Sequence, residues 1–140
     1  MKQAILDTDI LSYVLGNRFP DVDAKAKQYF RVFRYFSISV ITVSEIIKGL
    51  EATENYTGMA AFRSRVDEFE VFPIETDEAL VAGNILGALS RTALPIGDLD
   101  PFIAATAIVN QRPLVTNNVD HYQRIIALGF PLTLERWRDA

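Results

Sequence analysis

Short apolar segments alternate with helical patterns along nearly the whole chain, and this alternation limits the folds that are open to it. The strand-like segments cover residues 4–6, 37–40, 71–74, 114–116 and 131–134. The helical patterns cover residues 10–15, 22–36, 42–50, 56–69, 76–89 and 101–110, and a short helix follows from residue 117. Because strands that alternate with helices build parallel sheets with helices on both faces, we predict a three-layer α/β/α sandwich. Its central parallel sheet has four or five strands, and Pro73 suggests that the third segment lies at an edge.

Size and composition predict a single domain over residues 1–140 with an ordinary hydrophobic core. Apolar residues make up 49% of the chain and charged residues 23%, which is typical of a soluble globular protein. The absence of cysteine excludes disulfides, thiolate zinc sites and cysteine nucleophiles, and it suits a reducing cytosol. Asp7 and Asp9 interrupt the first apolar run too early for a signal-peptide core, and no apolar stretch is long enough to span a membrane. We therefore expect a cytoplasmic protein.

The formal net charge of −4 bears on what the protein binds. Proteins that hold nucleic acid by charge alone are usually basic, so this charge argues against a non-specific nucleic-acid binder. The argument does not extend to a nuclease that recruits divalent cations, because the cations carry the positive charge to the phosphates. The acidic side chains therefore need an explanation residue by residue.

Acidic and amide side chains lie where a parallel sheet binds its ligands, beyond the carboxyl ends of the strands. They are Asp7, Glu45 and Asn118, after the first, second and fourth strands, and Asp98 and Asp100, at the start of the buried helix. Carboxylates that share one crevice repel one another unless a divalent cation lies between them. Oxygen ligands without a histidine or cysteine partner indicate Mg²⁺ or Mn²⁺ rather than zinc. Such a site activates water to attack a phosphodiester bond.

Each of these residues also has a purely structural interpretation, because helix starts attract the same residue types. Thr42 and Glu45 fit a capping box, and Asp100 fits an N-cap followed by proline. Asp7 and Asn118 fit caps as well. A crevice that receives three uncompensated carboxylates is harder to explain structurally, since each buried carboxylate needs a partner. The set as a whole, and no single member, predicts a catalytic site.

Four blocks of the sequence carry a family resemblance. They span residues 5–11 (ILDTDIL), 41–50 (ITVSEIIKGL), 96–107 (IGDLDPFIAATA) and 114–118 (LVTNN). In this order and spacing they resemble the blocks of PIN domains, and Trp137 matches the aromatic residue often found near the end of such domains. In its length and in the sequences of these four blocks, the chain is most similar to VapC, the toxin of type II toxin–antitoxin pairs.

The resemblance implies an RNA endonuclease that requires Mg²⁺ or Mn²⁺. It also implies a homodimer held inactive by a VapB antitoxin, with transfer RNA or ribosomal RNA as the substrate. By position it makes Asp7, Glu45 and Asp100 catalytic, and Asp7 and Asp100 bind the metal, with Glu45 and Asp98 as further candidate ligands. The supporting residues, carried over in the same way, are Asp98, Thr116 and Asn118, the last standing where many PIN domains have aspartate. The resemblance leaves the roles of Asp9 and Asp120 open.

Two features fall outside the predicted site. His121 is the only histidine, and no activated serine or cysteine accompanies it, so we interpret it as a structural or surface residue. Tyr29, Phe30, Phe33 and Phe36 have helical spacing, which predicts core packing. Some aromatic residues of this stretch are also candidate contacts with an antitoxin or a second subunit.

Two other functions remain open from the sequence. A haloacid dehalogenase-type phosphatase also has a strand followed by a pattern like Asp7-Thr8-Asp9, whose first aspartate attacks phosphorus. That family places a hydroxyl residue where this chain has Leu11, and it needs a late lysine, whereas no lysine follows Lys48. The other alternative is a PIN-fold module that has lost catalysis and only binds a protein partner. The intact acidic set argues against such a module.

Overall fold

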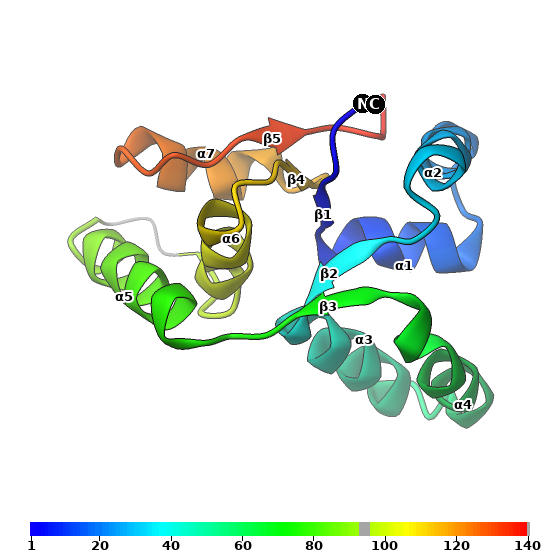
Figure 1. The fold of residues 1–140 in the computed structure, drawn as a ribbon. Coiled ribbons are helices and arrows are strands. Elements are labelled where there is room, and N and C mark those ends of the chain that lie inside the picture. Colours follow the sequence, from blue (N-terminus) through cyan, green and yellow to red (C-terminus); the bar gives the residue numbers. More distant parts are fainter. Residues whose placement is uncertain (93–95, 140) are drawn as a thin grey trace.

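The computed structural model describes residues 1–92 and 96–139, which form a five-stranded sheet covered by helices (Figure 1). The strands are β1 (Ile5–Leu6), β2 (Ser37–Ser39), β3 (Glu70–Phe72), β4 (Leu114–Val115) and β5 (Leu134–Glu135). The helices are α1 (Thr8–Gly16), α2 (Pro20–Phe33), α3 (Val40–Ala52), α4 (Tyr56–Arg65), α5 (Thr76–Ser90), α6 (Asp100–Val109) and α7 (Val119–Ala127). A short 3-10 helix, η1 (Val66–Glu68), joins α4 to β3.

The strands pair in parallel throughout, in the order β3-β2-β1-β4-β5. This confirms the parallel α/β/α architecture predicted from the alternation of strands and helices. β3 lies at an edge of the sheet, as Pro73 suggested, and its pairing with β2 ends at Phe72, directly before the proline. β1 is the central strand, so the residue that follows it lies in the middle of the sheet's carboxyl edge.

The two residues of β1 face opposite layers of the molecule. Leu6 packs with Ile38 and Val115 in a core that α1–α4 cover, whereas Ile5 packs with Leu114 in a core that α5–α7 cover. Figure 1 shows these two groups of helices on opposite sides of the sheet. All five side chains are fully buried, and burying each contributes about 1.5–3 kcal/mol. Strands buried on both faces give continuous apolar runs, which explains the pattern in the sequence.

The fifth strand begins later than the sequence pattern predicts. The expected segment was 131–134, but β5 covers Leu134–Glu135. Pro131 has no N–H to donate, and the Leu132 N–H donates to the carbonyl oxygen of Phe130 within a turn. Pairing with β4 starts only at the carbonyl oxygen of Thr133, which accepts from the Leu114 N–H at 2.8 Å.

Several helix boundaries also differ from the prediction, and two of them have a clear physical cause. α3 begins at Val40 rather than Thr42, because the Ser39 hydroxyl caps it by accepting from the Ile41 N–H at 3.1 Å. α2 ends at Phe33 rather than residue 36, because Arg34 takes the left-handed conformation with φ 70°. The start of α3 matters for the site, because it fixes where Glu45 lies on the helix.

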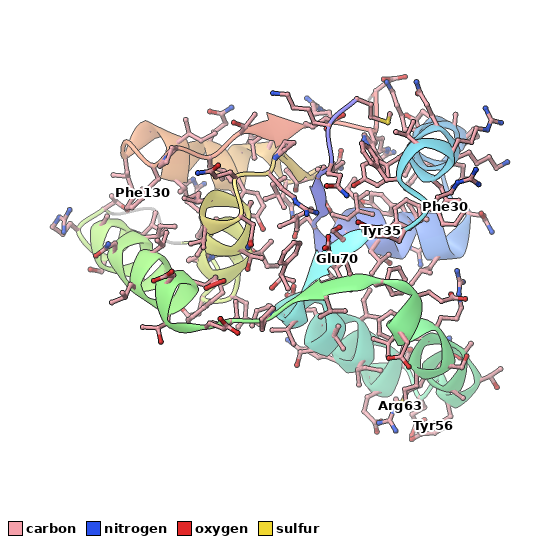
Figure 2. All side chains as sticks on the ribbon, in the orientation of Figure 1. Phe30, Tyr35, Tyr56, Arg63, Glu70 and Phe130 are labelled. Carbon is pink, nitrogen blue, oxygen red and sulfur yellow. The ribbon has the colours of Figure 1, made fainter. Side chains whose placement is uncertain are left out.

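The aromatic stripe of α2 is only partly core. Tyr29 is fully buried, stacks on Phe36 with ring centroids 5.7 Å apart and accepts a hydrogen bond from the Ala4 N–H. Phe30, labelled in Figure 2, is instead 45% exposed, so the prediction of core packing is wrong for this residue. None of the helices in the described part of the chain is long and apolar enough to cross a membrane.

Candidate active site

Asp7 is buried at the carboxyl end of β1, between the strand and α1. Its side chain is only 3% exposed and caps α1 by accepting from the Thr8 N–H at 2.9 Å. The same oxygen, Oδ1, accepts from the Tyr122 hydroxyl at 3.2 Å, and Oδ2 accepts from the Thr116 hydroxyl at 2.8 Å. The structural interpretation of Asp7 as a cap is therefore correct but incomplete, because two further donors from distant elements hold the carboxylate in one orientation.

Burial and neighbouring acids raise the pKa of Asp7 to about 7. Burial is the largest cause, and the negative charge of Asp9 is the next. The hydrogen bonds from Thr116 and Thr8 act in the opposite direction, and the charge of Asp100 adds to the increase. No lysine or arginine within residues 1–92 and 96–139 forms an ion pair with Asp7 or Asp9. The carboxylate therefore lies in a place that favours either a proton or a cation.

Asp9 belongs to the same acidic group. Its Oδ1 accepts from the Ile10 N–H at 2.7 Å, and its Oδ2 accepts from the Asn117 N–H at 3.0 Å. Burial raises the pKa of Asp9, these backbone hydrogen bonds counteract that increase, and the charge of Asp100 adds to it. The sequence left the role of Asp9 open, and in the structure its charge raises the pKa of Asp7.

Asp100 is the first residue of α6 and presents its carboxylate to the same group. The N-cap position belongs to Leu99, so the expectation that Asp100 caps this helix is wrong. Its side chain is 20% exposed, and Oδ2 lies 3.4 Å from Nδ1 of His121. The carboxylate contributes to the raised pKa of both Asp7 and Asp9. The charge of Asp100 therefore acts on Asp7 and Asp9, although about ninety residues separate Asp9 from Asp100 in the sequence.

Glu45 is joined to the start of α1 through Thr8, and no contact with Asp7, Asp9 or Asp100 is seen among the described residues. The Thr8 hydroxyl donates to Oε1 of Glu45 at 2.6 Å and lies 3.0 Å from the Thr42 hydroxyl. Because Ser39 caps α3, Glu45 lies in the second turn of the helix and forms no capping box, so the structural interpretation of this residue is wrong. Its orientation follows from a contact between α3 and the first residue of α1.

The three supporting candidates are placed differently from one another. Thr116 is fully buried, donates to Asp7 and accepts from the Asn118 N–H at 2.9 Å, so it fixes the corner after β4. Asn118 is the N-cap residue of α7, but its exposed side chain makes no capping hydrogen bond. Asp98 is exposed in the loop before α6. Thr116 alone of the three touches the acidic group through its side chain.

Helix α7 brings two further residues to the acids, and neither was among the predicted site residues. Burial and the Asp7 carboxylate raise the pKa of Tyr122 well above its ordinary value, so its hydroxyl remains a donor to Asp7 at neutral pH. A buried tyrosine needs a partner for its hydroxyl, and that requirement was the available signal in the sequence. His121 is on the surface, as expected, but it lies beside Asp100.

The donor chemistry of this group fits a hard divalent cation. Asp7, Asp9 and Asp100 offer carboxylate oxygens, which are the ligands that Mg²⁺ and Mn²⁺ prefer. In the part of the chain that the structure describes, no group of three or more histidine, cysteine, aspartate or glutamate side chains is placed to hold a metal ion. Mg²⁺ usually retains several waters and is held by one or two carboxylates, so a smaller set of protein ligands is sufficient.

Comparisons with known proteins show which proteins the chain resembles. The family model described as PIN domain matches residues 4–126. Ribonuclease VapC2 of Haemophilus influenzae is 30% identical over 129 residues, which cover 91% of this chain and 96% of that protein. A tRNA(fMet)-specific endonuclease VapC of Shigella flexneri is 28% identical, over 89% of this chain and 93% of that protein. The structure of a DNA-bound VapBC from Salmonella typhimurium superimposes with a TM-score of 0.79 at 26% identity, covering 99% of this chain and 100% of that one.

Proposed function

This chain belongs to the PIN domain family, and from that premise we propose that it is a metal-dependent endoribonuclease, the toxin of a toxin–antitoxin pair. The observation that carries the proposal is the buried carboxylate of Asp7, which faces two other acids without a lysine or arginine partner among the described residues. A purely structural carboxylate in this position would destabilise the fold, since burial penalises its charge. A bound cation would stabilise the same carboxylate in its charged form.

In this proposal Asp7 and Asp100 hold Mg²⁺ or Mn²⁺, with Glu45 and Asp98 as further candidate ligands. A cation held there would lower the pKa of a water and neutralise charge on the phosphodiester group. Thr116 and Tyr122 keep the Asp7 carboxylate fixed in orientation through their hydroxyl groups. Glu45, whose Oε1 is fixed by Thr8, orients the attacking water and accepts its proton. The products are two RNA fragments.

The partners follow from the relatives. The similar solved structures are VapBC complexes, so we propose a VapB-type antitoxin for this chain. We also propose a homodimeric toxin, which the resemblance to VapC implies. The substrate is RNA in the cytoplasm, and the VapC of Shigella flexneri, named for tRNA(fMet), makes transfer RNA the first substrate to test, with ribosomal RNA as the second. The net charge of −4 requires that bound cations carry much of the attraction to phosphate.

The proposal is tested by RNA cleavage with purified protein. We expect cleavage of transfer RNA with Mn²⁺ or Mg²⁺, no cleavage after addition of EDTA, and loss of activity of at least about 100-fold in Asp7→Asn. Asp67→Asn is a matched control, because it makes the same change at an exposed acid in η1, far along the chain from the site. Cleavage that persists in EDTA or in Asp7→Asn would refute the mechanism.

The same assay separates the alternatives. Hydrolysis of a small phosphomonoester instead of RNA would support the phosphatase, although Leu11 is fully buried in the core and offers no hydroxyl near the acids. Protein freed of its antitoxin that cleaves neither substrate would support a PIN-fold binding module. Growth arrest on expression of the wild type, but not of Asp7→Asn, would support the assignment as a toxin.

A further inference from the structure

The Thr8 hydroxyl contacts two side chains on one face of α3. Thr42 and Glu45 are three residues apart in this helix, so their side chains are neighbours on its surface. The Thr8 hydroxyl donates to Oε1 of Glu45 at 2.6 Å and lies 3.0 Å from the Thr42 hydroxyl. The backbone N–H of the same threonine donates to Oδ1 of Asp7 at 2.9 Å. A single residue therefore bonds to both carboxylates, those of Asp7 and Glu45.

The chemistry of hydroxyl groups decides which of these threonines donates to the other. A threonine hydroxyl has a single proton, and Glu45 accepts the one from Thr8. Their distance of 2.6 Å is typical of a hydroxyl that donates to a charged carboxylate, for which about 2.5–2.7 Å is usual. Thr42 must then donate to the oxygen of Thr8, although the distance between them allows either direction. The hydrogen bonds therefore form a chain that runs from Thr42 through Thr8 to Glu45.

The Thr42 hydroxyl is poorly explained by a role in the fold alone. Thr42 is fully buried, so its hydroxyl gives up its hydrogen bonds to water. Within residues 1–92 and 96–139, Thr8 is the only hydrogen-bond partner of this hydroxyl. The capping role that the sequence suggested for Thr42 belongs to Ser39. A valine would fill a similar space without a polar group to satisfy, so the hydroxyl needs another explanation.

We propose that Thr42 is a positioning residue, which acts through Thr8 to hold the Glu45 carboxylate in the orientation that RNA cleavage requires. This inference rests on the nuclease proposed above, in which Glu45 accepts the proton of the attacking water, and it adds a residue that touches neither carboxylate. Each donor in a chain of hydrogen bonds polarises the next, so the bond from Thr42 strengthens the bond from Thr8 to Glu45. Without Thr42 the Thr8 hydroxyl can rotate away, and Glu45 loses its fixed orientation. A base must be held in place to act, and a positioned base contributes about 100-fold to 10,000-fold to a rate.

Kinetics of RNA cleavage by purified protein test the inference when kcat and KM are measured separately. Thr42→Val is expected to lower kcat about tenfold and to change KM less than about twofold, because the orientation of the base affects the reaction rather than substrate binding. Thr42→Ser keeps the hydroxyl and should restore most of the rate. Thr53→Val is the matched control, since it makes the same change at the exposed end of α3, where the hydroxyl donates only to backbone carbonyl oxygens. It should leave kcat and KM unchanged.

A double variant shows whether Thr42 acts through Thr8. If it does, Thr8→Val combined with Thr42→Val should be as slow as Thr8→Val alone, within about twofold, whereas independent roles would multiply the two defects. Thr8 is only partly buried, so Thr8→Val tests the same chain even if thermal melting shows that Thr42→Val does not fold.

Several results would overturn the role of Thr42 and leave the proposed nuclease standing. They are an unchanged kcat in Thr42→Val or in Thr8→Val, equal defects in the valine and serine variants of Thr42, and multiplied defects in the double variant. A wild type that cleaves no RNA would instead refute the nuclease itself, and the positioning role would fall with it.

Discussion

Replacing Asp7 by asparagine is expected to stabilise the metal-free protein at alkaline pH while it destroys the activity. The carboxylate is 3% exposed and lies beside two other acids, so its ionisation opposes folding. The pKa of about 7 in the folded protein exceeds the ordinary value of 3.8. For a group whose pKa rises on folding, its contribution to stability is present in full below about pH 4 and is lost as the pH rises through about 7.

The magnitude follows from the same pKa. A change of about three units corresponds to roughly 4 kcal/mol, which the wild type loses between about pH 4 and pH 8. Asparagine avoids this loss, but its amide has one acceptor oxygen where the carboxylate offers two to Thr116, Thr8 and Tyr122. An unmatched donor costs about 1–2 kcal/mol. The net gain at pH 8 is therefore about 2–3 kcal/mol, or a melting temperature higher by about 5–10 °C.

Urea unfolding and thermal melting in EDTA, at pH 5 and pH 8, measure this difference. We expect Asp7→Asn to be more stable than the wild type at pH 8 and equal or less stable at pH 5. Asp67→Asn, an exposed acid in η1, should match the wild type at both values. A variant that is less stable at pH 8, or a difference that does not depend on pH, would show that burial does not penalise the Asp7 charge as argued.

Three further predictions concern the same group. Addition of Mn²⁺ at 100 times its dissociation constant should stabilise the wild type by about 2.7 kcal/mol at pH 8, seen as a higher melting temperature, and Asp7→Asn should lose most of this gain. Tyr122→Phe removes the donor to Oδ1 of Asp7, at 3.2 Å, and should lower the free energy of unfolding in urea by about 1 kcal/mol. Thr116→Val leaves both the Asp7 carboxylate and the Asn118 N–H without this partner, so RNA cleavage should fall at least about tenfold and stability by about 2 kcal/mol. Thr116→Ser keeps both hydrogen bonds, and equal defects in the valine and serine variants would contradict this role.

The architecture could be predicted because it depends on short-range patterns. Segments such as 4–6 and 114–115 are apolar throughout and too short for helices, so they had to be strands buried on both faces. Boundaries were less predictable, because they depend on single hydrogen bonds. The Ser39 hydroxyl starts α3 two residues before Thr42, and the turn at Leu132 delays β5, and neither contact has a clear signal in the apolar pattern.

The acidic group could be predicted only as residues that share one edge of the sheet. Asp7 follows β1 and Asp100 is the first residue of α6, and this position in the chain brings each of them to that edge. The contact of Glu45 with Thr8 depends on how α3 packs against α1, which no local pattern contains. His121 and Tyr122 were missed for the same reason, since their directions depend on the rotation of α7 about its axis when it packs on the sheet.

The direct passage from β1 into α1 has a consequence for redesign. Asp7 is the only residue between the two elements, so the junction has no loop residues that could compensate for an insertion or a deletion. One inserted residue would turn α1 by about 100° relative to the strand and carry Thr8 away from Glu45. Loop remodelling can therefore alter the surroundings of this carboxylate, but only a change in the sheet itself can relocate it.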